Sequence, residues 1–160
     1  MVGEFGVSEG YDDTDARLMR LVQADGRLSA AELSERVNLS PSACHRRLQR
    51  LERAGVIRGH VALLDARAVG RPLTVFVEIS LASQADDVLD AFEAAVARVP
   101  DVLECHLMAG AYDYLLKVIC RDADHFARLH RASLAGLPGV AKLQSSFALK
   151  TVSATTALPV

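Results

Sequence analysis

The stretch SPSACHRRLQRLE, residues 40–52, decides how the first part of this chain folds. A serine followed by a proline is typical of a helix start, because the serine side chain caps free amides and proline at the first helical position loses no hydrogen bond. Cys44, Leu48 and Leu51 then recur at i, i+4 and i+7, which predicts one buried helix face. We therefore expect a helix that begins after the first serine and ends at Gly55.

Two further helix starts with matched caps lie upstream. Asp12 has Asp15 three residues later, and Ser29 has Glu32 at the same spacing, so both pairs fit a capping box. The tight turn at residues 38–40 leads into the third helix, and two short helices, a turn and a third helix describe a helix-turn-helix. We place this domain at residues 12–65, with the motif at about 30–49, after a mobile tail at residues 1–11.

Charge is concentrated on the third helix although the whole chain has a net charge of −2. Between Pro41 and His60, five arginines stand against Glu52 alone. Arginine pairs bidentately with guanine, and serine hydroxyls at a helix N-terminus suit phosphates, so the pattern favours double-stranded DNA over a merely solvated face. We expect Arg46, Arg47 and Arg50 on the side opposite the apolar stripe. The expected DNA-contacting residues are Ser40, Ser42, Ala43, His45, Arg46, Arg47, Arg50 and Arg58.

The segment that follows the third helix alternates and then becomes apolar. Residues 56–64 predict a strand or small wing, and residues 66–72 predict a hinge that ends in Pro72.

The last ninety residues change to a different pattern. Alternation from Leu73 to Leu81 predicts a strand with its odd-numbered residues on one face, and the segments that follow give the order β-α-β-β-α-β. That order is typical of a ferredoxin-like domain, with both helices on one face of an antiparallel sheet. The overall fold class is therefore α+β, with the second domain at residues 73–160. The expected strands are 73–81, 102–109, 112–120 and 140–152, and the expected helices are 85–99 and 123–137, the second with Phe126, Leu129, Ser133 and Leu137 inward.

The other face of this sheet carries apolar residues that are costly to leave in water. Phe76 and Met108 are examples, and their position predicts a dimer that forms sheet to sheet.

Several classes of protein do not fit the composition. No basic stretch precedes an apolar run at the N-terminus, and no apolar segment is long enough to cross a membrane, so we expect a cytoplasmic protein associated with the nucleoid. Three cysteines without CxxC spacing argue against disulfides and a zinc site. No catalytic triad, phosphate-binding loop or metal cluster is evident, which argues against an enzyme.

The whole pattern resembles the Lrp/AsnC (feast/famine) family of prokaryotic transcription regulators. The resemblance runs from Asp12 to about Pro159 and depends on the order and spacing of short motifs rather than on any one of them. Those motifs are Asp12-x-x-Asp15, Asp25-Gly26-Arg27, Glu32-Leu33, Leu39-Ser40-Pro41-Ser42, Arg46-x3-Arg50-Leu51-Glu52-x2-Gly55-Val56-Ile57, Glu104-Cys105-His106, Gly110-x-Tyr112-Asp113-Tyr114-Leu115-Leu116-Lys117-Val118 and Leu137-Pro138-Gly139-Val140.

The resemblance implies pairing through the C-terminal sheet, further assembly to tetramers or octamers, and a small effector, typically an amino acid, near the turn between the second and third strands. No other cofactor is implied. Exposed amides at Gly110 would take the effector carboxylate and Asp113 its ammonium group. Ala111 departs from the acidic or amide residue that many relatives carry. The effector-binding residues implied are Met108, Gly110, Ala111, Tyr112, Asp113, Tyr114, Ser145 and Ser146.

Two alternatives share this layout. One is an architectural protein that coats DNA with little sequence preference. The other is an enzyme similar to the sirohaem decarboxylases, which use histidines and basic residues; here the candidates are His106, His125 and His130. Such enzymes do not need the basic helix that this chain keeps.

Overall fold

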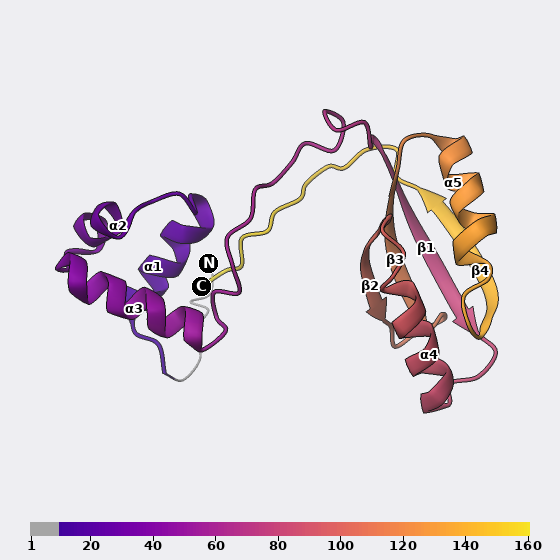
Figure 1. The fold of residues 1–160 in the computed structure, drawn as a ribbon, viewed down its shortest axis with the longest axis horizontal. Coiled ribbons are helices and arrows are strands. Elements are labelled where there is room, and N and C mark those ends of the chain that lie inside the picture. The colour runs from indigo at the N-terminus through magenta and orange to yellow at the C-terminus, as the bar shows by residue number, and fades with distance from the viewer. Residues whose placement is uncertain (1–9) are drawn as a thin grey trace, which may run out of the picture. The chain divides into compact units, whose positions relative to one another are not determined.

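The computed structural model describes residues 10–160, so most of the expected tail lies outside the described residues. The chain divides into two compact units (Figure 1). The N-terminal unit takes the chain up to Leu63 together with Ser153–Val160, and the C-terminal unit is Leu64–Val152. The last eight residues thus join the N-terminal unit, whereas the sequence placed them in the second domain.

The N-terminal unit contains three helices whose caps are those that the sequence predicts. They are α1 (Asp13–Ala24), α2 (Ala30–Val37) and α3 (Pro41–Arg53). Asp12 with Asp15 and Ser29 with Glu32 both form complete capping boxes, and Ser40 caps α3. The turn before α3 uses a left-handed residue at Asn38, with φ of 57°, which asparagine tolerates better than most residues.

Two apolar clusters hold these helices together. One cluster joins Leu18, Leu33 and Cys44, and the other joins Ala16, Met19 and Leu51 with the partly buried Tyr11, Ile57 and Val160. The C-terminal segment docks on α1, since the Leu158 amide donates to Gln23 Oε1 at 2.6 Å and Gln23 Nε2 donates back to the Leu158 carbonyl at 3.1 Å. These bonds explain why the last residues belong to this unit.

The strand expected at residues 56–64 is not formed. This segment carries no strand, and none of its amides from Arg58 onward bonds to another backbone segment among the described residues. A strand exists only when a neighbour pairs with it, so the apolar alternation alone was not sufficient.

The C-terminal unit confirms the ferredoxin-like arrangement. A four-stranded antiparallel sheet in the order β2-β3-β1-β4 carries both helices on one face (Figure 1). Val75, Val77 and Ile79 alternate inward and are fully buried beneath Phe92 and Phe126 of the helices. The elements are β1 (Leu73–Leu81), α4 (Asp86–Val96), β2 (Val102–Leu107), β3 (Tyr114–Cys120), α5 (Ala123–Leu129) and β4 (Val140–Phe147).

The second helix and the last strand differ in detail from the prediction. Helix α5 continues as a π-helical segment, His130–Leu134, whose wider turn shifts the inward register by one residue. Leu134 is therefore fully buried, whereas Ser133 is only half-buried, contrary to the expected stripe. Strand β4 ends at Phe147 rather than residue 152, because its register with β1 ends at the Val75–Phe147 pair and only the bond from the Ala148 amide to the Thr74 carbonyl follows.

Candidate DNA-contacting surface and effector site

Helix α3 presents an exposed face near its N-terminus. Ser42, His45 and Arg46 are exposed, and Ala43 is half-buried. The Ser40 hydroxyl accepts the Ala43 amide at 3.2 Å, so this side chain serves first as the helix cap. The first two turns therefore offer one hydroxyl, one imidazole and one guanidinium to a ligand that approaches the helix start.

Arg47 does not lie opposite the apolar stripe as predicted, whereas Arg50 is exposed, and both arginines form ion pairs with α1. Arg47 Nη1 donates to Asp12 Oδ2 at 2.8 Å and to Asp15 Oδ1 at 2.9 Å, and Arg50 pairs with the other Asp15 oxygen. The Asp15 side chain is fully buried, and that of Arg47 is 27% exposed. Residue 47 follows Cys44 by three and precedes Leu51 by four, so it stands at the edge of the buried face rather than opposite it.

These contacts make an ionic clamp, by which we mean Asp12, Asp15, Arg47 and Arg50, between the start of α1 and the middle of α3. The pKa of Asp12 is lowered, first because its carboxylate accepts the Asp15 amide and then because it accepts Arg47. The pKa of Arg47 is raised by its hydrogen bonds to Asp15 and Asp12. The clamp thus fixes α3 on α1 and neutralises part of the charge that the sequence assigned to DNA.

Two polar residues on the exposed face were missed by sequence reasoning. Gln49 is half-buried and Arg53 exposed, and together with Ser42 and Arg46 they recur at steps of four, three and four residues. That spacing follows one face of a helix. The same periodicity that identified Cys44 as buried would have found them if it had been applied to the polar residues.

The loop between β2 and β3, residues 108–113, is anchored by Asp113. Its carboxylate accepts the Leu81 amide at 2.7 Å and Gln84 Nε2 at 2.6 Å, and its own amide donates to the Ile79 carbonyl at 2.9 Å. Asp113 therefore ties the loop to the end of β1.

The tip of this loop is open. Gly110 and Ala111 are exposed and Tyr112 half-buried, and the amides of these three residues make no hydrogen bond to another described residue. Successive free amides in an exposed turn are suited to an anion such as a carboxylate. Met108 stands at the start of the loop and is 36% exposed.

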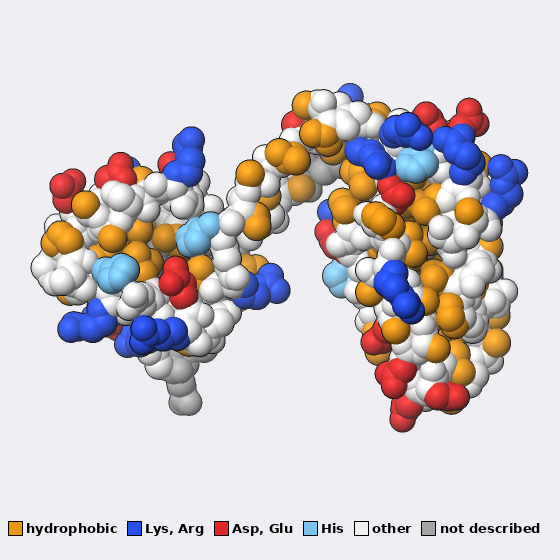
Figure 2. All heavy atoms as spheres, viewed as in Figure 1, with side chains coloured by type: hydrophobic (Ala, Val, Ile, Leu, Met, Phe, Trp, Pro, Cys, Tyr) orange, Lys and Arg blue, Asp and Glu red, His pale blue; other side chains and the backbone are white. Residues whose placement is uncertain are grey.

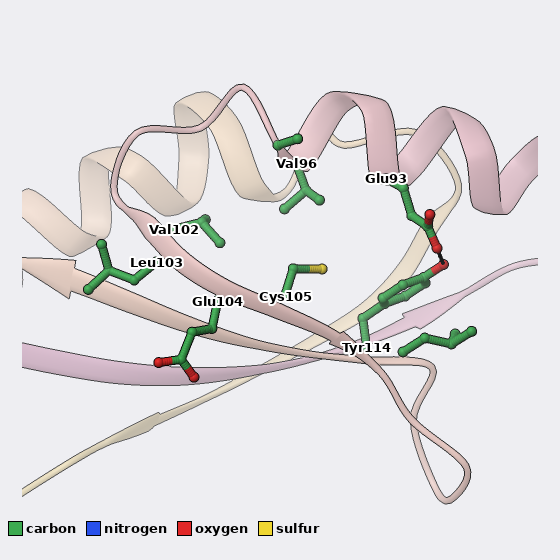
Figure 3. A pocket seen from close by; sticks show the side chains of 9 residues that line it. Glu93, Val96, Val102, Leu103, Glu104, Cys105 and Tyr114 are labelled. Atoms are coloured by element: carbon green, nitrogen blue, oxygen red, sulfur yellow. Dashed lines mark hydrogen bonds between the residues drawn. The ribbon is translucent and has the colours of Figure 1, made fainter. Parts of the chain in front are cut away.

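Tyr114 begins β3 and belongs to the core instead of the loop. It is 1% exposed and its ring lies 4.4 Å, centroid to centroid, from that of Phe92. Its hydroxyl donates to Glu93 Oε1 at 2.8 Å (Figure 3). Burial, and then the Glu93 carboxylate, raise the pKa of Tyr114.

Beside Tyr114, a groove of about 370 Å³ separates α4 from the edge strand β2 (Figure 3). Apolar side chains form most of its lining, and Glu93 and Glu104 add carboxylates. The lining residues are Glu93, Val96, Ala97, Val102, Leu103, Glu104, Cys105, Leu107 and Tyr114.

Ser145 and Ser146 lie on β4, on the other side of β1 from the loop. They pair with Val77 and Phe76, two and three residues before Ile79, where the Asp113 amide bonds to β1. At roughly 3.3 Å per residue, the serines are separated from this anchor by about 7–10 Å along β1.

The comparisons with known proteins agree with this two-unit geometry. The sequence model of the Lrp/AsnC ligand binding domain matches residues 74–158, and that of a winged helix-turn-helix DNA-binding domain matches residues 11–58. The chain belongs to the Lrp/AsnC family of transcription regulators.

Individual Lrp/AsnC relatives span most of the chain. The leucine-responsive regulatory protein of Salmonella typhimurium is 45% identical over 129 residues, which cover 81% of this chain and 79% of the relative. A transcriptional regulator from Neisseria meningitidis, solved as a complex with L-Met, has 42% identity and a TM-score of 0.88, covering 93% of this chain and 96% of its own. An AsnC-family regulator from Agrobacterium tumefaciens has 37% identity and a TM-score of 0.89, covering 93% and 97%.

Membership of the Lrp/AsnC family assigns the two units their general roles. The helix-turn-helix binds DNA, and the ferredoxin-like unit is a ligand-binding domain. The family is one of regulators and not of enzymes. Within residues 10–160, no helix is long and apolar enough to cross a membrane, and no group of three His, Cys, Asp or Glu side chains is placed to hold a metal ion.

Proposed function

We propose that this chain is a sequence-specific transcription regulator whose DNA binding or assembly responds to an amino acid. The exposed face of α3 carries the DNA part of the proposal, because it presents Ser42, His45, Arg46 and Gln49 without the ionic clamp occupying them. Arg46 is the residue best suited to pair with a guanine edge. Ser40 caps the helix N-terminus, which in this proposal faces a DNA phosphate, and the exposed Arg58 contacts the DNA backbone.

A mobility-shift titration against a bound genomic fragment tests the reading face. Arg46→Ala removes a contact worth about 1–3 kcal/mol, so affinity should fall roughly 5- to 150-fold. Arg27→Ala is the control, because that side chain is 92% exposed and pairs only with Asp25 among the described residues. Equal losses in the two variants would contradict the assignment of the face.

The effector part of the proposal is supported by the relative solved with L-Met and by the free loop amides. The effector carboxylate would meet the amides of Gly110, Ala111 and Tyr112. Asp113 uses one hydrogen bond on each oxygen, so each oxygen keeps a lone pair for the ammonium group. Because Ser145 and Ser146 lie about 7–10 Å along β1 from the loop anchor at Ile79 and on the far side of that strand, any part they take requires a ligand that reaches across β1 or a second copy of the chain.

Thermal-shift screening of the twenty amino acids is the direct test. An amino acid that binds only the folded protein stabilises it by RT ln(1 + [L]/Kd), which is about 2.7 kcal/mol at a hundredfold excess over Kd. Asp113→Ala should abolish the shift. Gln84→Ala, which removes one of the same loop bonds but no carboxylate, should retain it. An unchanged shift in the Asp113 variant would place the effector elsewhere.

The proposal includes a homodimer that forms through the open face of the sheet and associates further to tetramers or octamers. Phe76 points to this face and is 39% exposed, beside the half-buried Leu115 and Ile119. Sedimentation should show a smaller species for Phe76→Lys than for Leu149→Lys, a control at a side chain that is 99% exposed. Dimers of equal strength in both variants would contradict sheet pairing.

The second candidate function is that of an architectural protein that coats DNA, since the same fold serves a sequence-specific regulator and an architectural protein. Fragments selected from the source genome distinguish them, because a regulator enriches a recurring palindrome and an architectural protein enriches none. In either role the protein would act on the chromosome in the cytoplasm.

A further inference from the structure

One end of the C-terminal unit collects arginines that neither the DNA-reading helix nor the effector loop uses. Leu73 pairs with Cys120, and the Ile119 amide donates to the Asp101 carbonyl, so the segments before β1, before β2 and after β3 meet at one end of the sheet. The arginines of these segments and of the adjoining helix form what we call the basic end: Arg71, Arg98, Arg121 and Arg128.

Most of this charge is free. Arg98, Arg121 and Arg128 are exposed and form no ion pair with any residue from 10 to 160. Arg71 pairs with Asp101, which also lies 3.8 Å from His125 Nε2. Asp101 is thereby shared by two basic groups. Asp122 and Asp124 add two exposed carboxylates at the start of α5, but neither forms an ion pair with Arg98, Arg121 or Arg128.

The opposite end of the same unit has the opposite charge. Asp86, Asp87 and Asp90 begin α4 there, and Asp113 anchors the neighbouring loop. Lys and Arg side chains crowd the end where β1 begins, with a few acidic ones among them, while the charged side chains visible at the other end are acidic (Figure 2). The C-terminal unit is therefore polarised along its strands.

Both chain connections to the DNA-binding unit leave from the basic end. The linker enters β1 at Leu73, and the returning segment leaves β4 beside it, where the Ala148 amide bonds to Thr74. The shorter of the two connections is the returning segment from Ala148 to Leu158, which docks on α1, and its ten residues span at most about 36 Å. One turn of B-DNA is about 34–36 Å, so DNA that flanks the bound site lies within reach.

We propose that the basic end is a second DNA-contacting surface, which binds the phosphate backbone next to the site read by α3 without reading sequence. The partner is double-stranded DNA because the DNA-binding unit already holds it close, and a tethered second site acts at a high effective concentration. Arginine guanidinium groups suit phosphate oxygens, and contacts of this kind position DNA without specifying bases.

The proposal is tested with the full-length protein by measuring how its DNA affinity depends on salt concentration, on duplexes of two lengths. Each phosphate contact contributes about 0.9 to the slope of log K against log[salt]. The triple variant Arg98→Gln, Arg121→Gln and Arg128→Gln should therefore lower the slope by about 2–3 on a duplex of roughly 40 base pairs, long enough to extend beyond one turn on either side of the site. On a duplex that ends at the α3 site, its slope should equal that of the wild type.

A charge-matched pair separates a local contact from bulk charge. Arg128→Gln and Lys142→Gln each remove one exposed positive charge, from the basic end and from the opposite end. Only the first should reduce the slope on the long duplex. Equal slopes for the wild type and the triple variant, equal losses on both duplexes, or equal effects of the two single variants would overturn the proposal.

Sedimentation of the protein without DNA tests whether the basic end binds a second copy of the chain instead of DNA. If the basic end instead docked on the acidic end of a second copy, the triple variant would sediment as a smaller species without DNA, and that result would also overturn the proposal. Unchanged sedimentation and an unchanged melting temperature are expected, because all three side chains are exposed.

Discussion

Replacing Asp15 with asparagine removes the buried carboxylate that Arg47 and Arg50 share. In the wild type, the Asp12 amide donates to Asp15 Oδ2 at 3.1 Å. Asparagine has nearly the same shape as aspartate, so the side-chain carbonyl oxygen of an asparagine at position 15 can still accept this hydrogen bond. The charge is lost, and an amide group then faces one of the two guanidinium groups. The substitution thus isolates the ionic clamp from the helix cap.

The size of the loss follows from the exposure of the partners. Breaking a buried ion pair costs about 3–5 kcal/mol when the remaining charge stays buried. Here the Arg47 and Arg50 side chains are 27% and 51% exposed, so water restores part of their solvation. We therefore expect the N-terminal unit to lose about 2–3 kcal/mol of its free energy of unfolding, in the range of hydrogen bonds to charged groups.

Amide hydrogen exchange measures this loss within one unit of the chain. The most protected amides of α1 and α3 should exchange roughly 30- to 150-fold faster, while those of β1 and β3 stay unchanged. Asp13→Asn is the control, because Asp13 is exposed in the same helical turn and pairs with no described arginine. Its cost should stay below about 1 kcal/mol, that of a helix-dipole interaction. Equal exchange in the two variants would refute the clamp.

Three further outcomes are expected. The pKa of Asp12 is lowered from its ordinary value of 3.8, so its stabilising effect should be complete above pH 4 and vanish as the pH falls through the lowered value; urea unfolding of Asp12→Asn and wild type from pH 7 to 2 should therefore converge in acid. Leu134→Ala should lower the free energy of unfolding by about 2–5 kcal/mol and Ser133→Ala by less than about 0.5, and the reverse order would contradict the π-helical register. Gly139→Ala should lower the melting temperature, because φ is +74° there and a Cβ would lie 2.6 Å from Val88 Cγ1; an unchanged melting temperature would contradict this turn.

Local signals in the sequence were sufficient for the caps and for most of the elements. Asp12 with Asp15 and Ser29 with Glu32 were found from spacing alone, because a capping box involves residues only three apart. Strand β1 was predicted with its exact bounds, since alternation over nine residues directly after Pro72 is specific.

The features that were missed depend on contacts between distant parts of the chain. Arg47 meets Asp12 across 35 residues, and Asp113 meets Leu81 across 32, so neither contact is visible in a local pattern. The docking of Leu158 on Gln23 joins the two ends of the chain for the same reason. The π-helical turn before Leu134 has no sequence signal that periodicity detects.

Selection of genomic fragments by the purified protein tests the central claim most directly. Wild-type protein should enrich a recurring palindromic motif, and Arg46→Ala should lose that enrichment while its helices and its amide exchange stay unchanged. The absence of any motif with the wild type, or the same motif and affinity with Arg46→Ala, would contradict the account of α3 as the helix that reads DNA.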